Sequence, residues 1–224
     1  IIVAKTFNRH TNIYNTLAAS ALFLLLINPY LIMEVGFQLS YLAVIGIVYI
    51  QPKIYEWFEF DNWLLDQIWM ITAVSIAAQI ATFPLGLHYF HQFPNYFLLS
   101  NLIVIPVSTL IIYVGIALFS FSTIPLFVKY LAIVFTWLIW FLNASVKWIE
   151  SLPFSLLQGI SISVFETWLL YGLIILFLFY LSNRKYKFLI YSLSFCVVIL
   201  ISQVIEQYIQ FNQKRIVVYN IAKT

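Results

Sequence analysis

The sequence predicts an all-α polytopic membrane protein, a bundle of about seven helices in which some segments are broken by proline, re-entrant or interfacial. The first reason is composition: 63% of the 224 residues are hydrophobic and only 8% are charged. A soluble domain has about 45–50% apolar and about 25% charged residues. The second reason is a mean hydropathy of +0.98. A water-soluble fold could not cover so much apolar surface, so soluble classes are excluded.

The first expected helix covers residues 12–27, which is short for a membrane span of about 20 residues. Asn28 and Pro29 end it, because proline cannot donate a backbone N–H and disfavours helical geometry in the residue before it. Helix is expected to resume at Met33 and to continue to Ile50. Residues 53–66 mix acids with Tyr and Trp, a pattern typical of an amphipathic segment at the membrane interface.

The third expected helix ends or kinks at Pro84, and the fourth contains Pro106. A proline within a span is tolerated where protein or a water-filled cavity satisfies the freed carbonyl. The predicted ranges of the third to seventh helices are 67–83, 96–119, 129–147, 165–181 and 188–204. Residues 1–205 are thus assigned to one transmembrane domain. Residues 206–224 are assigned to a linker and the first strand of a missing extracytoplasmic domain, so the chain is expected to be a piece of a longer protein.

Polar side chains recur on one side of four successive predicted helices, and they are the candidate lining or gating residues of a channel. On the second helix, Glu34 and Gln38 share a face, whereas Gly36 and Ser40 lie opposite and are small enough for close helix packing. The candidate lining residues are Glu34, Gln38, Ser75, Gln79, Asn101, Ser108, Lys129, Asn143 and Lys147. The residues assigned to helix packing or helix breaks are Asn28, Pro29, Gly36, Ser40, Pro84 and Pro106.

These polar faces have two interpretations. Interhelical hydrogen bonds hold many membrane bundles together, and they explain any single face. Four faces together, with proline breaks near them, favour a polar conduit instead. On the fifth helix, Lys129, Thr136, Trp140, Asn143 and Lys147 form a continuous stripe, although lysines at helix ends also reach the interface by default.

The sequence carries no catalytic motif. His88 and His91 have a spacing that could hold a metal, but no Cys or third His stands near them, so neither a metal nor a cofactor is predicted. The single cysteine, Cys196, excludes an internal disulfide. No phosphate-binding loop or nucleophile elbow is present, and the chain is therefore not predicted to be an enzyme.

A short basic turn predicts the orientation. Arg184, Lys185 and Lys187 lie between two apolar helices and should face the cytoplasm. Counting helices from that turn places Lys129 inside and the 84–94 loop outside. The C-terminal tail is then extracytoplasmic.

Two blocks of the sequence resemble a known family. The segment 15–46 carries Asn28-Pro29 and Gly36-Phe37-Gln38-Leu39-Ser40, and the segment 77–106 carries Gln79, Pro84, Tyr89-Phe90-His91, Asn101 and Pro106. Together they resemble the ComEC/Rec2 family of competence proteins. The blocks occur in the family's order and separation, and they cover about half of the chain. Glu34 stands where many relatives carry Asp, which keeps the charge.

The resemblance implies a channel that passes one strand of transforming DNA across the bacterial cell membrane during natural competence. It also implies partners: single-stranded DNA, the lipid bilayer, other domains of the full-length chain, a competence DNA receptor, a cytoplasmic helicase and other copies in a homo-oligomer. Relatives often carry a metallo-β-lactamase-like nuclease domain after the membrane region. Two alternatives stay open at this point, a small polar-solute transporter and a structural membrane subunit.

Overall fold

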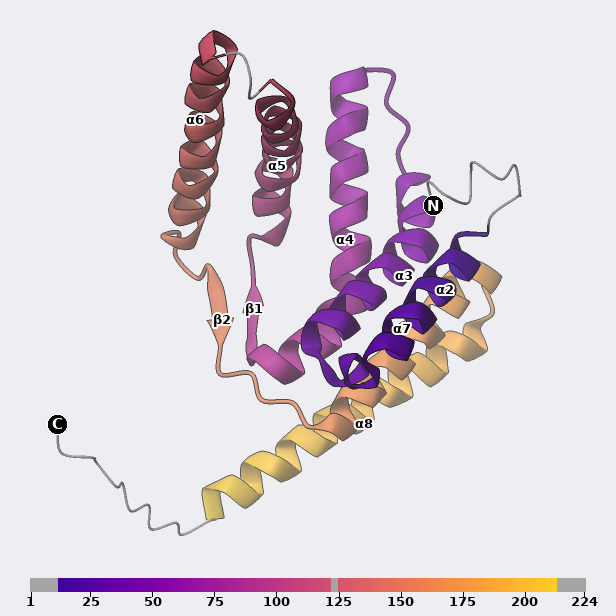
Figure 1. The fold of residues 1–224 in the computed structure, drawn as a ribbon. Helices are drawn as coiled ribbons and strands as arrows, with labels where there is room; N and C mark the ends of the chain where they lie inside the picture. The colour runs from indigo at the N-terminus through magenta and orange to yellow at the C-terminus, as the bar shows by residue number, and fades with distance from the viewer. Residues whose placement is uncertain (1–11, 122–124, 213–224) are drawn as a thin grey trace, which may run out of the picture. The chain divides into compact units, whose positions relative to one another are not determined.

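The computed structural model describes residues 12–121 and 125–212. They fall into two compact units, residues 1–161 and 162–224, which are considered separately. Figure 1 shows the elements of both units. Unit 1 holds α2 (Ile13–Ile27), the 3₁₀ helix η1 (Pro29–Met33), α3 (Val35–Tyr55), α4 (Trp63–Phe90), β1 (Gln92–Pro94), α5 (Phe97–Ser120), α6 (Pro125–Glu150) and β2 (Leu156–Gln158). Unit 2 holds α7 (Val164–Asn183) and α8 (Tyr186–Asn212).

The predicted fold class is confirmed. Within the described residues, six helices, α3 to α8, are long and apolar enough to cross a membrane. The seventh, α2, has 15 residues and is therefore only about 22 Å long, shorter than the hydrocarbon core of a bilayer. The protein is an all-α polytopic membrane protein.

The predicted helix stop at Asn28 is confirmed and has a definite geometry. The Asn28 backbone N–H donates to the Leu24 carbonyl at 2.9 Å and closes α2. Its side-chain Oδ1 accepts from the Tyr30 backbone N–H at 3.1 Å and opens η1. One residue thus caps two helices, and Pro29 at the first position of η1 lacks the N–H that would be unsatisfied there.

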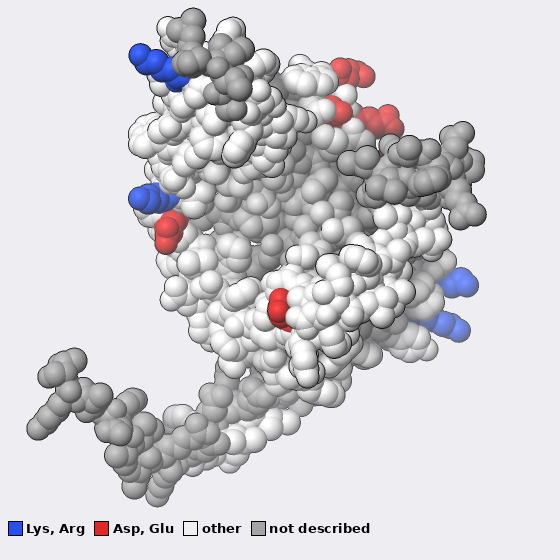
Figure 2. Space-filling model, in the orientation of Figure 1, with Lys and Arg blue, Asp and Glu red and all other residues white. Residues whose placement is uncertain are grey.

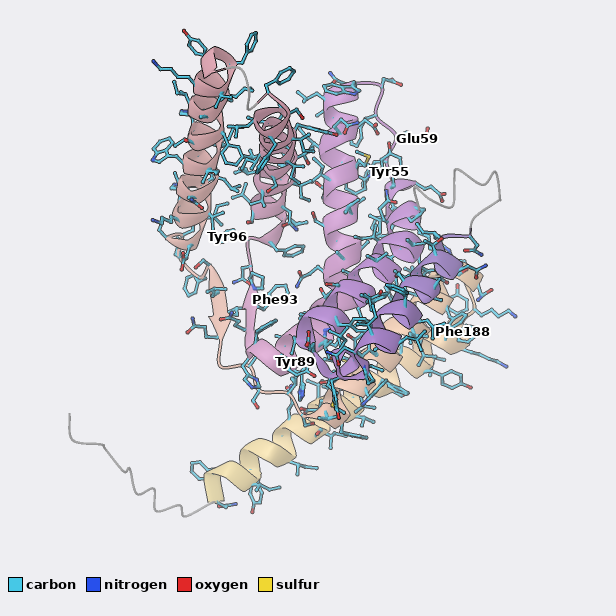
Figure 3. All side chains as sticks on the ribbon, in the orientation of Figure 1. Tyr55, Glu59, Tyr89, Phe93, Tyr96 and Phe188 are labelled. Atoms are coloured by element: carbon cyan, nitrogen blue, oxygen red, sulfur yellow. The ribbon has the colours of Figure 1, made fainter. Side chains whose placement is uncertain are left out.

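The α3–α4 connection differs from the predicted interfacial segment. Residues up to Tyr55 continue α3, residues 56–62 form a connection, and α4 already begins at Trp63. The Tyr55 hydroxyl donates to Asp66, and the Trp69 ring N–H donates to the Tyr55 carbonyl at 3.0 Å. Phe58 also packs edge-on against Trp69, with ring centroids 5.1 Å apart. These contacts tie the end of α3 and the connection to the start of α4; Figure 3 labels Tyr55 at the end of α3.

Helices α3 and α4 lie very close together at Gly46. A Cβ at this position would lie 2.4 Å from Ala81 Cβ and 2.8 Å from the Ala77 carbonyl oxygen. Real Cβ atoms essentially never come within 3.0 Å of a heavy atom from another part of the chain. Ala77 is fully buried in the same contact region. Only glycine therefore permits this helix spacing, as in other membrane helix pairs built on small residues.

Pro84 kinks α4 but does not end it. The helix continues to Phe90 and changes direction toward β1 in its last turns (Figure 1). Pro84 is buried within the protein, whereas Pro106, inside α5, is exposed. His91 closes the helix in the left-handed conformation, with φ at 53°. The predicted loop at 84–94 thus shortens to the residues after Phe90.

A two-stranded ribbon joins the α4–α5 connection to the segment after α6. β1 and β2 are antiparallel, with Gln92 opposite Gln158 and Phe93 opposite Leu157. The Asn95 side chain donates to the Phe154 carbonyl at 2.6 Å, and the Tyr96 hydroxyl donates to the Pro153 carbonyl at 3.0 Å. Because α5 and α6 lie between β1 and β2, two membrane crossings return the chain to the side from which it started. The pairing of β1 with β2 agrees with this, since both strands then lie on the same side.

The register of the ribbon predicts which pair of engineered cysteines will form a disulfide. In a Cys196→Ser background, Gln92→Cys with Gln158→Cys is expected to cross-link at least about fivefold faster than Gln92→Cys with Leu157→Cys, because successive strand residues point to opposite faces. Non-reducing electrophoresis of the full-length protein measures the rate. Equal rates for the two pairs would contradict the register.

Unit 2 is a helical hairpin. Ser163 and Glu166 form a capping box at the start of α7: the Ser163 Oγ accepts from the Glu166 backbone N–H at 3.2 Å, and Glu166 Oε2 accepts from the Ser163 backbone N–H at 2.9 Å. Arg184, with φ at 54°, makes the turn into α8. A Cβ at Gly172 would lie 2.5 Å from the Phe195 ring, so a larger residue there would require that ring to move. The predicted domain boundary at 205 falls inside α8, and the predicted strand in the tail lies outside the described residues.

Candidate functional site

A groove of unit 1 lies between α3, α4 and the ribbon. Its volume is about 480 Å³. The lining residues that can form hydrogen bonds through their side chains are Ser40, Gln79, Thr82 and Gln92. The others are apolar: Leu39, Ala43, Phe83, Gly86, Leu87, Phe90, Phe93, Pro94 and Leu156. No lining residue carries a charge.

The groove residues of α3 and α4 are spaced about one helical turn apart and therefore share a face of each helix. On α4, Gln79, Phe83 and Gly86 follow one another at spacings of about one turn, so they share a face. On α3, Ser40 and Ala43 are related in the same way. A Cβ at Gly86 would meet nothing within 4 Å, so its missing side chain leaves space. Thr82 donates to the Ala78 carbonyl of its own helix at 2.9 Å, which leaves Gln79 as the principal polar side chain of the α4 wall.

Phenylalanine rings form much of the remaining wall. Phe83 of α4 and Phe93 of β1 meet edge to face, with ring centroids 5.4 Å apart and an interplanar angle of 88°. Phe93 also packs against Phe97 at 6.0 Å, and Figure 3 shows it on the strand below Tyr96. Phe90 is different, because 54% of its surface is exposed. The groove therefore offers one accessible ring beside two that are held by neighbours.

Gln38 joins three parts of unit 1. Its side-chain N–H donates to the Ile32 carbonyl of η1 at 2.8 Å, and its Oε1 accepts from the Tyr89 hydroxyl of α4 at 3.2 Å. The half-buried amide thus connects the 3₁₀ turn, α3 and the last turns of α4. Gln38 does not line the groove, although Ser40 lies two residues further along α3.

Two other predicted lining residues of α3 and α4 lie in different surroundings. Glu34 is the exposed N-cap of α3, and its side chain makes no capping hydrogen bond. Ser75 is buried and donates to the Ile71 carbonyl of its own helix at 2.8 Å. Neither residue lines the groove.

The predicted residues of α5 and α6 also lie outside the groove. Asn101 and Ser108 of α5 are half-buried, and Pro106 is exposed. On α6 the predicted stripe is an exposed face: Lys129, Thr136, Trp140, Asn143 and Lys147 are all exposed. A surface hollow of about 480 Å³ on this helix is lined by Ala132, Ile133, Thr136, Trp137 and Trp140.

Gly36 and Ser40, both predicted to pack against another helix, have different surroundings in the structure. Within the described residues nothing lies within 4 Å of a Cβ built at Gly36, and the close helix contact occurs at Gly46 instead. Ser40, assigned to packing, is exposed and lines the groove. Of the predicted lining residues, the groove contains only Gln79, and it is joined there by Ser40, which was assigned to packing.

Sequence reasoning missed one buried acid. Glu166 is 0% exposed, and its Oε1 has no hydrogen-bond partner among the described residues. The spacing of Ser163 and Glu166 is that of a capping box, and this pattern could have identified Glu166 from the sequence. Among the described residues no group of three or more His, Cys, Asp or Glu side chains gathers at a metal-binding distance.

Charged side chains are sparse on the visible surface. Figure 2 shows a few small groups of acidic and basic side chains on a surface that is otherwise uncharged. Such a surface suits a lipid environment. Long apolar helices, glycine-mediated helix contacts and an uncharged, partly polar groove together define a polytopic membrane protein.

Comparison with known proteins gives the family. Residues 1–184 match the model of the Competence family, described as competence protein, so this chain belongs to the competence protein family of the ComEC/Rec2 type. It is also similar to ComE operon protein 3 of Bacillus subtilis (strain 168), with 31% identity over 96 residues. That alignment covers 43% of this chain and 12% of the relative, so the chain spans a minor part of that protein's length. No solved structure matches the chain.

Proposed function

We propose that this chain forms part of a membrane channel that carries single-stranded DNA into the cell during natural competence. The observation that carries the proposal is the groove, in which Ser40 and Gln79 from the two family-like blocks meet on neighbouring membrane helices. Polar side chains within spans are costly in lipid and are commonly functional. Membership of the competence protein family supports DNA as the solute.

The wider path is assembled from the polar faces of several helices. Ser40 and Gln79 contact the DNA strand, and Gln38 holds together the helices on which these two residues lie. Glu34, Ser75, Asn101 and Ser108 line or gate neighbouring stretches, while Lys129, Asn143 and Lys147 on the exposed face of α6 offset phosphate charge. That face meets another domain of the full-length chain or another copy in a homo-oligomer.

The basic turn at Arg184 orients the chain. With that turn in the cytoplasm, alternating crossings place the ribbon on the extracytoplasmic side, together with the C-terminal tail. The ribbon side then faces a competence DNA receptor, and a cytoplasmic helicase pulls from the other side.

Gln79→Leu in the full-length protein tests the proposal. We expect DNA uptake to fall about tenfold, because loss of one hydrogen bond to the transported strand is worth on the order of 1–1.5 kcal/mol. Gln67→Leu is the matched control: it makes the same change on the same helix, outside the groove. Uptake is measured in a deletion strain supplied with duplex DNA in which each strand carries its own label.

Protein level and surface DNA binding should be unchanged in both variants. If Gln79→Leu transports DNA as well as Gln67→Leu does, the groove is not part of the path. If the deletion strain takes up DNA normally but loses uptake of a small polar solute, the chain is a transporter of that solute.

A further inference from the structure

We propose that the groove takes the bases of the transported strand and that the phosphates stay outside it. This inference rests on the function proposed above and specifies which part of the DNA the groove contacts. It follows from the charge, the rings and the amides of the lining.

The first argument is charge. The 13 residues that line the groove include no Lys, Arg, His, Asp or Glu. Each phosphate of a DNA strand carries a full negative charge, and moving a charge from water into such surroundings without a partner is costly. A nucleobase is uncharged and largely apolar on its faces. The groove therefore fits bases better than backbone.

The second argument is the arrangement of the rings. Phe83 and Phe93 hold each other edge to face, whereas Phe90 is 54% exposed at the same groove. An exposed ring can stack on any base, because every base has a π face. Such binding tolerates every sequence, which a protein that imports DNA of arbitrary sequence requires.

The third argument is the amide chemistry. Gln79 of α4 and Gln92 of β1 reach the groove from different elements. Each amide offers both donors and an acceptor, so it can pair with the edge of any base. A cation would instead select phosphate. The lysines among the described residues of unit 1 are Lys53 on α3 and Lys129 and Lys147 on α6, and none of them lines the groove.

Site-directed cross-linking distinguishes base contact from backbone contact. The full-length protein carries Ser40→Cys in a background without other cysteines. The matched control is Gly36→Cys, one turn earlier on α3, where a Cβ meets nothing within 4 Å. Two single-stranded DNA probes are compared during uptake, one with a bromoacetamide on a short arm at thymine C5 and one with the same arm on a backbone phosphoramidate.

We expect Ser40→Cys to capture the base-linked probe at least about tenfold more efficiently than the backbone-linked probe, since stacking holds bases in the groove. Gly36→Cys should show no such preference. Equal capture of the two probes at Ser40, preferential capture of the backbone-linked probe, or no capture while uptake proceeds would each overturn the inference. Because uptake itself is intact in these outcomes, they leave the channel proposal standing.

A second pair of variants tests the ring directly. Phe90→Leu is expected to lower the rate of DNA uptake on the order of tenfold, whereas Phe90→Tyr retains the ring and should stay within about twofold of the parent. Equal rates for the two variants would overturn the stacking role. Membrane levels of the full-length protein, measured in parallel, separate loss of transport from loss of folding.

Discussion

Gly46→Val is expected to lower the amount of folded full-length protein in the membrane by at least about tenfold. A Cβ at this position would lie 2.8 Å from the Ala77 carbonyl oxygen, and a backbone atom cannot move away unless α3 and α4 separate. Overpacking of a tight contact costs about 1–3 kcal/mol, and about 1.4 kcal/mol corresponds to a factor of ten. Immunoblots of membrane fractions and thermal aggregation in detergent measure the effect.

Gly36→Val is the matched control for this prediction. It introduces the same side chain into the same helix, and a Cβ there meets nothing within 4 Å. Adding Ala81→Gly to Gly46→Val removes the 2.4 Å contact but not the carbonyl contact, so rescue should be partial. If Gly46→Val accumulates as well as Gly36→Val, the α3–α4 packing described above is wrong.

Gln38→Leu is expected to reduce DNA uptake about tenfold or more and to lower the thermal stability of the full-length protein. The change removes both hydrogen bonds of the amide, one to the Ile32 carbonyl and one to the Tyr89 hydroxyl. Each such bond contributes about 0.5–1.5 kcal/mol. Surface DNA binding should be unchanged, because the change lies within the α3–α4 hairpin.

Tyr89→Phe separates a positioning role of Gln38 from simple contact with DNA. It removes one of the two hydrogen bonds, so its effect should be smaller and of the same kind. In the Gln38→Leu background, Tyr89→Phe should add little, since their shared bond is already lost. Full additivity of the two changes, or a Tyr89→Phe protein identical to the parent, would show that Gln38 acts independently of Tyr89.

The predicted helices are largely correct because lipid-facing sequences carry a strong signal. The range 96–119 differs from α5 by one residue at each end, and the helix stop at Asn28 is where the structure has it. The third helix is less well predicted. The sequence left open whether the helix ends or kinks at Pro84. In the structure Pro84 is buried, and α4 bends and continues to Phe90. Local propensity does not contain that information.

The candidate groove was predictable only in part. Ser40 and Gln79 belong to blocks that resemble a known family, so both were identified, although Ser40 was assigned to packing. Phe90 and Gln92 were missed as groove residues because their placement depends on the pairing of β1 with β2. That pairing joins residues more than 60 positions apart, and no periodicity within one helix predicts it.

The sequence alone determined the membrane class, the approximate helices and the family resemblance, since hydropathy and short motifs are local properties of the chain. The tertiary structure decided which polar side chains meet. A helix wheel defines the angle of a residue about its own axis but not the identity of the neighbouring helix. The contact at Gly46 and the ribbon fix those neighbours, and they place Ser40 and Gln79 at one uncharged groove while Gln38 holds the surrounding helices together.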